Sequence, residues 1–281
     1  MAITAKMVQE LRERTGAALM DCKRALESSA GDLEAAIDNL RKAGLKSADK
    51  RAGRSTAEGR VQAVFARDGK AGAMVALTSE TDFVARTEDF KALLTKLTQV
   101  AFDAKLTSPE ALLEQKVDGS LAQEAIKALS GKLGENVQVP KVAYFANAKG
   151  QVGGYVHHND KVAALVSVTS SAPAEKVQAF LKDLGMHVTF ARPQALVREE
   201  IPPEAVEREK AVIAESDEVK SKPEDKRERI VTGKLEKFYA GLALLEQPWF
   251  KDDKQSVSKV LAAELGKDAR IAGFALFVVG A

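Results

Sequence analysis

The residue types that most often bind metal ions or act as nucleophiles are scarce in this chain: its 281 residues include three histidines and one cysteine. Two of the histidines, His157 and His158, are adjacent, and Asp160 could complete a three-ligand zinc site with them. Adjacent residues of a strand point to opposite faces, so we favour an exposed strand end and turn over a metal site. His187, in the segment Met-His-Val, is expected at the start of a short strand around 187–190, as a structural histidine with its hydrogen bonds satisfied.

The remaining candidates for a nucleophile or an acid–base pair are Cys22 and the adjacent carboxylates Glu199 and Glu200. Cys22 lies on the apolar face of an expected short helix, so we interpret it as a buried hydrophobic residue rather than a reactive thiol. Glu199 and Glu200 precede a highly charged segment and are expected to be solvated. The sequence contains no phosphate-binding loop, dinucleotide fingerprint, nucleophile elbow, or HExxH or CxxC motif. We therefore predict a protein that is not an enzyme, needs no metal ion or cofactor, and does not itself bind a nucleotide.

The segment Thr81-Asp82-Phe83-Val84 is a polar loop with an apolar centre, placed between an expected strand and an expected helix. Two alternatives are open for Phe83. It packs into the core at the strand-to-helix junction, or it stays exposed and inserts into a partner protein. The residue types alone favour neither alternative.

Opposite charges are almost balanced: 42 basic and 40 acidic residues give a net charge of +2, and the two signs are mixed along the chain. A protein that mainly binds nucleic acid usually has a basic surplus, so this balance disfavours RNA or DNA as the main partner. A single cysteine excludes a disulfide within the chain and is typical of a reducing compartment. The longest apolar run, Phe274 to Val279, is far shorter than the roughly 20 residues of a membrane span. Lys6 and Arg12 interrupt any secretory leader, so we expect a cytoplasmic location without membrane contact.

The N-terminal part of the chain is predicted to form a small unit of three helices, because apolar residues recur there at helical spacing. Thr4 can cap the first helix, which ends near Gly16, and the second helix covers about 18–28. The third helix is expected to end at Gly44. The polar and basic segment over 45–60 is predicted to be a linker, with some helical character left open.

The rest of the chain is predicted to contain two rounds of hairpins and helices. The expected elements are a hairpin over 61–77 with its turn at Asp68-Gly69, a helix from Thr87, helical patterns to about 133, strands over 137–145, 151–157 and 162–168, a helix over 174–184, a charged helical hairpin over 201–240 broken near Pro223, a helix over 257–265 and a strand over 271–279. Strict strand–helix alternation is absent, so we expect an α+β fold with mainly antiparallel sheets. The expected domains are 1–54, 55–140 and 141–281, the last including the helical hairpin.

Three motifs resemble one protein family. They are LRERTGAALMDCKRAL over 11–26, GDLEAAIDNLRKAG over 31–44 and TDFVAR over 81–86. All three are similar to segments of elongation factor Ts. The shorter segments GENVQV, GGYVHH and GMHV follow in the order that this family shows, so the resemblance extends over nearly the whole chain.

The resemblance implies a fold with a ubiquitin-associated-like three-helix domain, a two-part α+β core and a projecting coiled coil. It also implies a guanine-nucleotide exchange factor in translation elongation, which binds elongation factor Tu in its GDP-bound and nucleotide-free forms. By resemblance, Asp82 and Phe83 insert into the nucleotide domain of Tu and disturb its Mg²⁺ and phosphate site. Thr81 and Val84 would shape the inserting loop.

Other positions match the family less directly. Arg12, Leu19 and Met20 match positions where the N-terminal domain contacts Tu, with Leu19 in place of a methionine found in some members. His157 resembles a core position that faces the third domain of Tu. Some members continue with a further C-terminal helix that contacts Tu, a contact expected to be missing after Ala281.

Two other functions remain as alternatives. The chain could be a protein-interaction scaffold, or an RNA-binding translation protein that uses a basic cluster in the linker. That cluster consists of Lys46, Lys50, Arg51, Arg54 and Arg60. The charged hairpin leaves open whether it pairs with a second copy of the chain, giving a homodimer, or projects alone.

Overall fold

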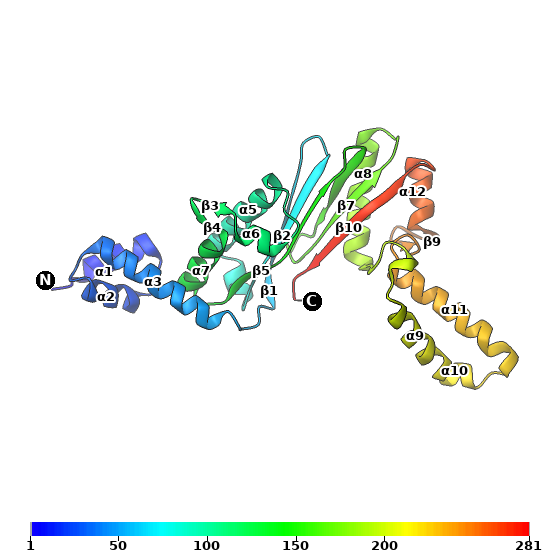
Figure 1. The fold of residues 1–281 in the computed structure, drawn as a ribbon, viewed down its shortest axis with the longest axis horizontal. Helices are drawn as coiled ribbons and strands as arrows, with labels where there is room; N and C mark the ends of the chain where they lie inside the picture. Colours follow the sequence, from blue (N-terminus) through cyan, green and yellow to red (C-terminus); the bar gives the residue numbers. More distant parts are fainter. Residues whose placement is uncertain (1, 281) are drawn as a thin grey trace.

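The structure is a computed structural model that describes residues 2–280, and it is elongated. Three helices lie at one end, two β-sheets occupy the middle, and a helical hairpin projects at the other end (Figure 1). Helices and antiparallel sheets are thus combined in the α+β manner that the sequence predicts.

The N-terminal helices are α1 (Ala5–Thr15), α2 (Leu19–Ser28) and α3 (Leu33–Arg51). The hydroxyl of Thr4 accepts a hydrogen bond from the Met7 amide at 3.3 Å and so caps α1, as predicted. Gly16 ends α1 in the left-handed conformation. The three helices share a core that consists of Val8, Leu11, Cys22, Ala25, Leu26 and Ala36. The prediction that Cys22 is buried is therefore confirmed.

The prediction that the third helix ends at Gly44 is wrong, because α3 continues to Arg51. Gly44 lies where α3 crosses another helix, α7 (Ala122–Leu133), and its nearest neighbour there is the Cα atom of Gly131. A glycine inside a helix, at a crossing with another helix, looks the same in sequence as one that ends a helix. The non-helical connection is therefore shorter than the predicted linker and begins at residue 52.

Two three-stranded antiparallel sheets form the middle of the molecule. The first has the order β1 (Glu58–Phe65), β2 (Ala71–Ser79) and β5 (Val137–Ala146), and the second has the order β10 (Arg270–Val278), β7 (Val162–Thr169) and β6 (Gly150–Val156). Their facing side chains form one apolar cluster of Val61, Met74, Ala76, Val152, Ala163, Leu165 and Phe277. The residues from Ala73 to Leu77 are buried along their whole length, as expected for a strand covered on both faces.

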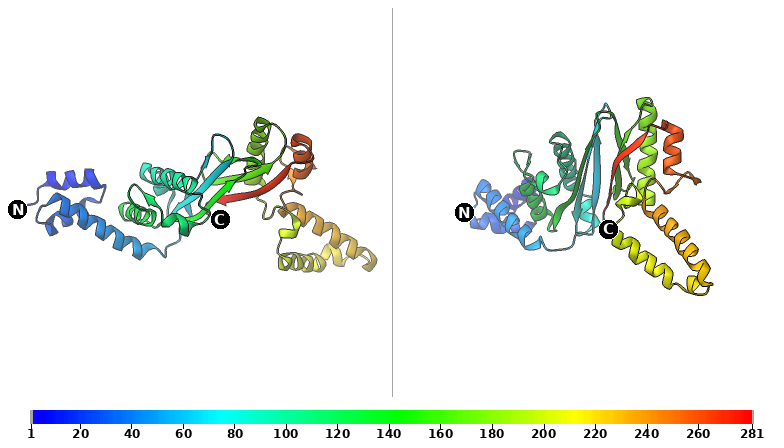
Figure 2. Two further views of the ribbon diagram at one scale, coloured as in Figure 1. Left: turned by 45° about the horizontal axis from the view of Figure 1, so that its top comes forward. Right: turned by 45° about the vertical axis from the view of Figure 1, so that its right-hand side comes forward.

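Helices cover the outer face of each sheet (Figure 2). On the first sheet these are α5 (Glu88–Asp103), α6 (Pro109–Leu113) and α7, together with the short turn α4 (Asp82–Ala85) and the small hairpin of β3 (Lys116–Val117) and β4 (Ser120–Leu121). On the second sheet they are α8 (Ala174–Ala191) and α12 (Val257–Leu265), with β8 (Pro248–Trp249) and β9 (Asp252–Ser256) beside them. The molecule is therefore layered as helices, sheet, sheet and helices.

The strand predicted around 187–190 does not exist, because α8 continues through it to Ala191. Leu184, His187 and Val188 are all buried on one side of α8. Their spacing of three and four residues continues the helical period of the preceding turns, which the β-branched residues Val188 and Thr189 obscure in sequence.

The charged hairpin consists of α9 (Pro203–Glu215), α10 (Asp217–Lys220) and α11 (Glu224–Leu242), and it breaks next to Pro223 as predicted. A short 3₁₀ helix, η1 (Arg198–Glu200), leads into it. At its base, Arg198 pairs with Glu236 at 2.9 Å and with Glu246 at 2.5 Å. Within residues 2–280, no helix is both long and apolar enough to cross a membrane.

Candidate functional site

Thr81 to Val84 form the start of the single helical turn α4, directly after β2. Thr81 is the N-cap residue, and its hydroxyl accepts a hydrogen bond from the Val84 amide at 3.5 Å. Val84 is buried, whereas the side chain of Phe83 is 80% exposed. Of the two alternatives for Phe83, the structure therefore shows the exposed one.

Glu135, in the turn after α7, holds this loop in place. Its carboxylate accepts two hydrogen bonds from Thr81, one from the backbone amide at 2.9 Å and one from the hydroxyl at 2.6 Å. Sequence reasoning did not identify Glu135 as a site residue. The available signal was its place in the family-like GENVQV segment.

A second carboxylate, Glu80, joins the loop to the end of the linker. The Asn136 amide donates a hydrogen bond to Glu80 at 2.7 Å and, with the nearby guanidinium of Arg54, lowers the pKa of Glu80 below its ordinary value. The Asn136 side chain in turn donates to the carbonyl oxygen of Arg54 at 2.8 Å. Two adjacent residues at the start of the loop, Glu80 and Thr81, are thus fixed by hydrogen bonds.

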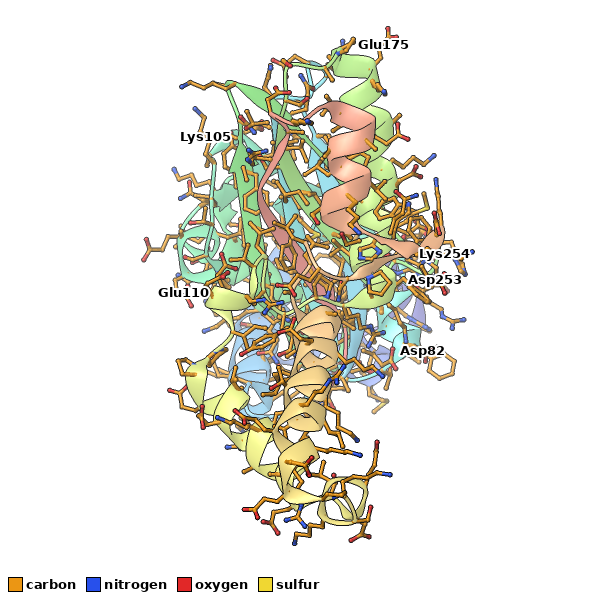
Figure 3. The ribbon with its side chains drawn as sticks, turned by 90° about the vertical axis from the view of Figure 1, so that its right-hand side faces the viewer. Asp82, Lys105, Glu110, Glu175, Asp253 and Lys254 are labelled. Atoms are coloured by element: carbon orange, nitrogen blue, oxygen red, sulfur yellow. The ribbon has the colours of Figure 1, made fainter. Side chains whose placement is uncertain are left out.

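Asp82 is the acidic member of the loop and pairs with Arg86 at 2.8 Å. In the view along the molecule's long axis, Asp82 lies on the same side as Asp253 and Lys254, and Lys105 and Glu110 lie on the opposite side (Figure 3). Asp82 therefore marks one side of the elongated molecule.

The predicted N-terminal site residues lie on a different part of the molecule from Phe83. Leu19 and Met20 begin α2 and are 49% and 60% exposed, and Arg12 is an exposed residue of α1. Two neighbouring large apolar side chains are thus open to solvent next to the α1–α2 turn. Figure 1 shows α1 and α2 at the N-terminal end of the molecule, apart from β2, which leads into the Thr81–Val84 loop.

His157 lies at the end of β6, where its Nδ1 atom is 3.2 Å from the hydroxyl of Tyr155 and its ring centroid is 4.2 Å from that of His158. Asp160, the third residue of the alternative metal site, forms an ion pair with Arg60. Among the residues that the structure describes, no group of three His, Cys, Asp or Glu side chains could hold a metal ion.

His187 is fully buried, and its hydrogen bonds are only partly satisfied, contrary to prediction. The side-chain amide nitrogen of Gln247 donates to the carbonyl oxygens of Ala191 and Gly241, so the amide oxygen is left to accept from Nε2 of His187 at 3.0 Å. The Nδ1 atom has no partner within the described chain. Burial disfavours the charged imidazolium and so lowers the pKa of His187. Glu199 and Glu200 are exposed, as expected.

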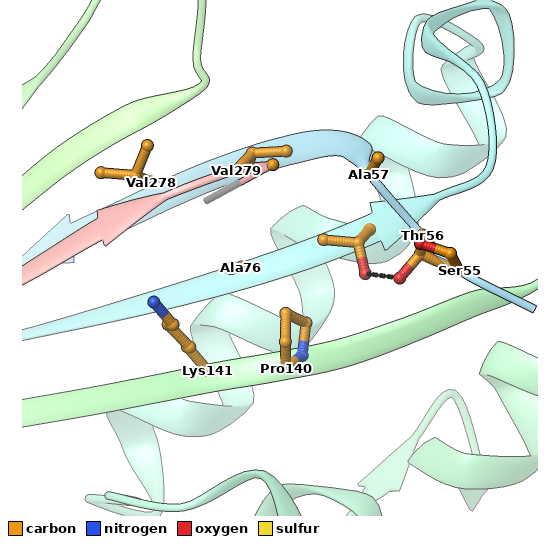
Figure 4. A pocket seen from close by; sticks show the side chains of 10 residues that line it. Ser55, Thr56, Ala57, Ala76, Pro140, Lys141, Val278 and Val279 are labelled. Carbon is orange, nitrogen blue, oxygen red and sulfur yellow. Dashed lines mark hydrogen bonds between the residues drawn. The ribbon is translucent and has the colours of Figure 1, made fainter. Parts of the chain in front are cut away.

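An open hollow lies where the end of β10 meets β2 and β5 (Figure 4). Its lining consists of Ser55, Thr56, Ala57, Ala76, Thr78, Pro140, Lys141, Val278, Val279 and Gly280. The hydroxyls of Thr56 and Thr78 are 2.9 Å apart and satisfy each other. Lys141 is the one charged side chain of this lining, so the hollow offers no acid–base pair.

Comparison with known proteins identifies the family. The sequence model of the family described as Elongation factor TS matches residues 80–281. Curated proteins named Elongation factor Ts are 39% identical over 282 residues in Clostridium botulinum, covering 99% of this chain and 93% of the relative, and 37% identical over 285 residues in Magnetococcus marinus, covering 100% and 93%. A third, from Teredinibacter turnerae, is 39% identical over 281 residues, covering 100% and 92%. This chain belongs to the elongation factor Ts family of translation elongation factors.

Proposed function

We propose that this protein is a guanine-nucleotide exchange factor that binds elongation factor Tu and promotes release of its GDP, and that it is not an enzyme. The observation that carries the proposal is Phe83, which is 80% exposed on a turn whose neighbours are fixed. An aromatic side chain held in place before binding loses little conformational freedom when it inserts into a partner. The membership of the elongation factor Ts family supports the same partner.

The proposed mechanism needs no covalent step. GDP on Tu is held in part through Mg²⁺, which demands near-octahedral oxygen ligands at short distances. Phe83 inserts as a wedge, and Asp82 places a carboxylate next to it. The segments of Tu that carry the Mg²⁺ ligands then shift slightly, and this shift weakens the binding of GDP. The coupling is reciprocal, and a tenfold weakening requires about 1.4 kcal/mol of binding energy.

Two further surfaces supply that binding energy in this proposal. Leu19 and Met20, with Arg12 nearby, form the N-terminal surface, and His157 belongs to a third surface on the second sheet. We place the domain boundaries at 1–54, 55–140 and 141–281, with a ubiquitin-associated-like fold for the first domain and a coiled coil for the helical hairpin at about 201–240.

The test is release of fluorescent GDP from elongation factor Tu in a stopped-flow instrument, with Phe83→Ala as the variant. We expect release to be slowed by at least tenfold, or about 1.4 kcal/mol. Circular dichroism and thermal unfolding should not change, because the side chain removed is exposed. Phe190→Ala is the matched control, since Phe190 is 78% exposed but lies on α8.

The other outcomes are equally informative. Acceleration that Phe83→Ala leaves intact would move the mechanism to other contacts. If the unsubstituted protein does not accelerate release, the exchange function is wrong and the scaffold alternative remains. Calorimetric titration of Tu separates these two functions, because a scaffold binds Tu equally well with and without GDP.

A further inference from the structure

Two helices that are far apart in the sequence meet at a pair of glycines. Gly44 in α3 faces Gly131 in α7, and a Cβ atom added to Gly131 would lie 2.7 Å from the Cα atom of Gly44. It would also lie 2.9 Å from the backbone carbonyl carbon and oxygen of Gly44. Neither glycine has a positive φ angle, so at Gly131 it is the close approach of the two backbones, rather than backbone conformation, that excludes a side chain.

Side chains of the two helices also make contacts across this crossing. Asp49 of α3 pairs with Lys127 of α7 at 2.8 Å, and the Arg51 guanidinium lies 3.5 Å from the carbonyl oxygen of Ser130. Lys132 of α7 also extends to the α1–α2 turn, where a Cβ atom on Gly16 would meet its Cε atom at 2.4 Å. Exposed ion pairs of this kind contribute little each, so the backbone contact between the glycines defines the geometry.

The end of α7 is linked through one side chain to the loop that carries Phe83. Gly131 is followed four residues later by Glu135, whose carboxylate holds Thr81. On its other side, α3 leads back to α2 with Leu19 and Met20. The crossing of α3 and α7 thus connects the two surfaces that the proposed function assigns to the partner.

We propose that Gly131, where α7 crosses α3 at Gly44, is a positioning residue, which sets the distance and orientation between the Leu19–Met20 surface and Phe83. The role in exchange rests on the proposed function, but the rigid crossing does not. Two surfaces held at a fixed spacing bind a partner together more tightly than the same surfaces on a flexible tether.

The two glycines provide a matched pair of variants. In Gly131→Ala the added methyl group overlaps the backbone of α3, which must retreat by roughly 1 Å to restore van der Waals contact. In Gly44→Ala the nearest atom is the Gly131 Cα at 3.6 Å, an ordinary contact. Both changes replace a helical glycine by alanine and so carry the same gain in helix propensity.

The placement of the N-terminal helices relative to the sheets, which depends on the crossing, is measured as a distance between two spin labels by pulsed electron paramagnetic resonance on the full chain. Spin labels are attached through Glu10→Cys in α1 and Lys149→Cys in the β5–β6 turn, both exposed positions, with Cys22 replaced by alanine. We expect the same narrow distance distribution for the parent and Gly44→Ala, and a displaced or broadened one for Gly131→Ala. GDP release from elongation factor Tu should be slowed several-fold by Gly131→Ala alone.

An unchanged distance distribution in Gly131→Ala would overturn the proposed crossing. A changed distribution with unchanged exchange would overturn the positioning role and leave the exchange function intact. Should the parent fail to accelerate GDP release, the exchange function fails, while the distance measurement still decides whether the crossing is rigid. If Gly131→Ala does not fold, Asp49→Lys replaces it, because it sets a like charge against Lys127 at the same crossing and leaves both glycines in place.

Discussion

In the segment from Thr81 to Val84, the first and last side chains fix the backbone, and Phe83 between them faces outward. Thr81 bonds to Glu135 and Val84 enters the core, whereas Phe83 faces solvent. A backbone held at Thr81 and Val84 fixes the direction in which the Phe83 side chain leaves the turn. The position of its ring is therefore determined partly by Glu135, which lies outside the Thr81–Val84 segment.

This division of roles predicts that Glu135→Gln slows exchange although Phe83 is intact. An amide offers one acceptor oxygen in place of the two that Thr81 uses, so one hydrogen bond to a charged group is lost, at a cost of about 1.5–3 kcal/mol. We expect GDP release to be slowed roughly threefold to tenfold, because part of that free energy goes into loosening the turn. Stopped-flow release and thermal unfolding measure the two effects.

Glu88→Gln is the control for this change. Glu88 begins the next helix, and its side chain is 90% exposed in an ion pair with Lys91. Equal behaviour of Glu135→Gln and Glu88→Gln would show that the bond between Glu135 and Thr81 does not position the loop.

At the scale of helices and strands, glycines mark the closest contacts. Gly185 of α8 lies against β6, and a Cβ atom there would be 2.7 Å from the Tyr155 amide nitrogen and 2.8 Å from the Gly154 carbonyl carbon. Gly233 of α11 has no atom within 4 Å of such a position. The same residue type therefore has opposite consequences in two helices.

We predict that Gly185→Ala and Gly233→Ala change stability in opposite directions. Gly185→Ala must push α8 away from β6 and should lower the free energy of unfolding by about 1–3 kcal/mol. Gly233→Ala should raise it by up to about 1 kcal/mol through helix propensity. Urea unfolding followed by circular dichroism measures both, and a stabilised Gly185→Ala would contradict the packing of α8 on the sheet.

The same elements show what the sequence could and could not predict. The hairpin around Asp68-Gly69 and the helix over 257–265 were predicted correctly, because turn chemistry and helix caps are local signals. The end of the third helix at Gly44 and the strand around 187–190 were wrong. Both errors involve contacts with distant elements. Gly44 lies inside α3 at its crossing with α7. His187 lies inside α8 and is buried against Trp249, with 5.2 Å between the two ring centroids.

For the candidate site, the sequence identified the Thr81–Val84 segment but not Glu135, the residue that holds it in place. Resemblance to the family singled out Thr81 to Val84, and only the fold shows that Phe83 is exposed and Val84 buried. Glu135 is 54 positions away from Thr81 in the chain. Its carboxylate reaches the loop because β5 pairs antiparallel with β2 and places Val137 opposite Ser79, and no local pattern encodes that pairing.

At the scale of the whole molecule, the buried side chains fall into separate clusters. The N-terminal helices share a cluster of six buried residues, whereas the strands Ala71–Ser79 and Val162–Thr169 are covered by helices on one side and by the opposite sheet on the other. A small cluster stabilises its helices less than a two-sided core stabilises its strands. The proposed boundary near residue 54 therefore separates parts of unequal stability.

Hydrogen exchange on the intact chain tests this boundary. We expect amides of α1 and α2 to exchange through a local opening, and those of β2 and β7 only through global unfolding. Leu26→Ala sharpens the test, because Leu26 is fully buried in the N-terminal cluster and its truncation costs about 2–5 kcal/mol there. Exchange should then rise by orders of magnitude in α1 and α2 and stay unchanged in β2 and β7. An equal rise in all four elements would mean that the chain unfolds as one cooperative unit, in which case the first domain does not end near residue 54.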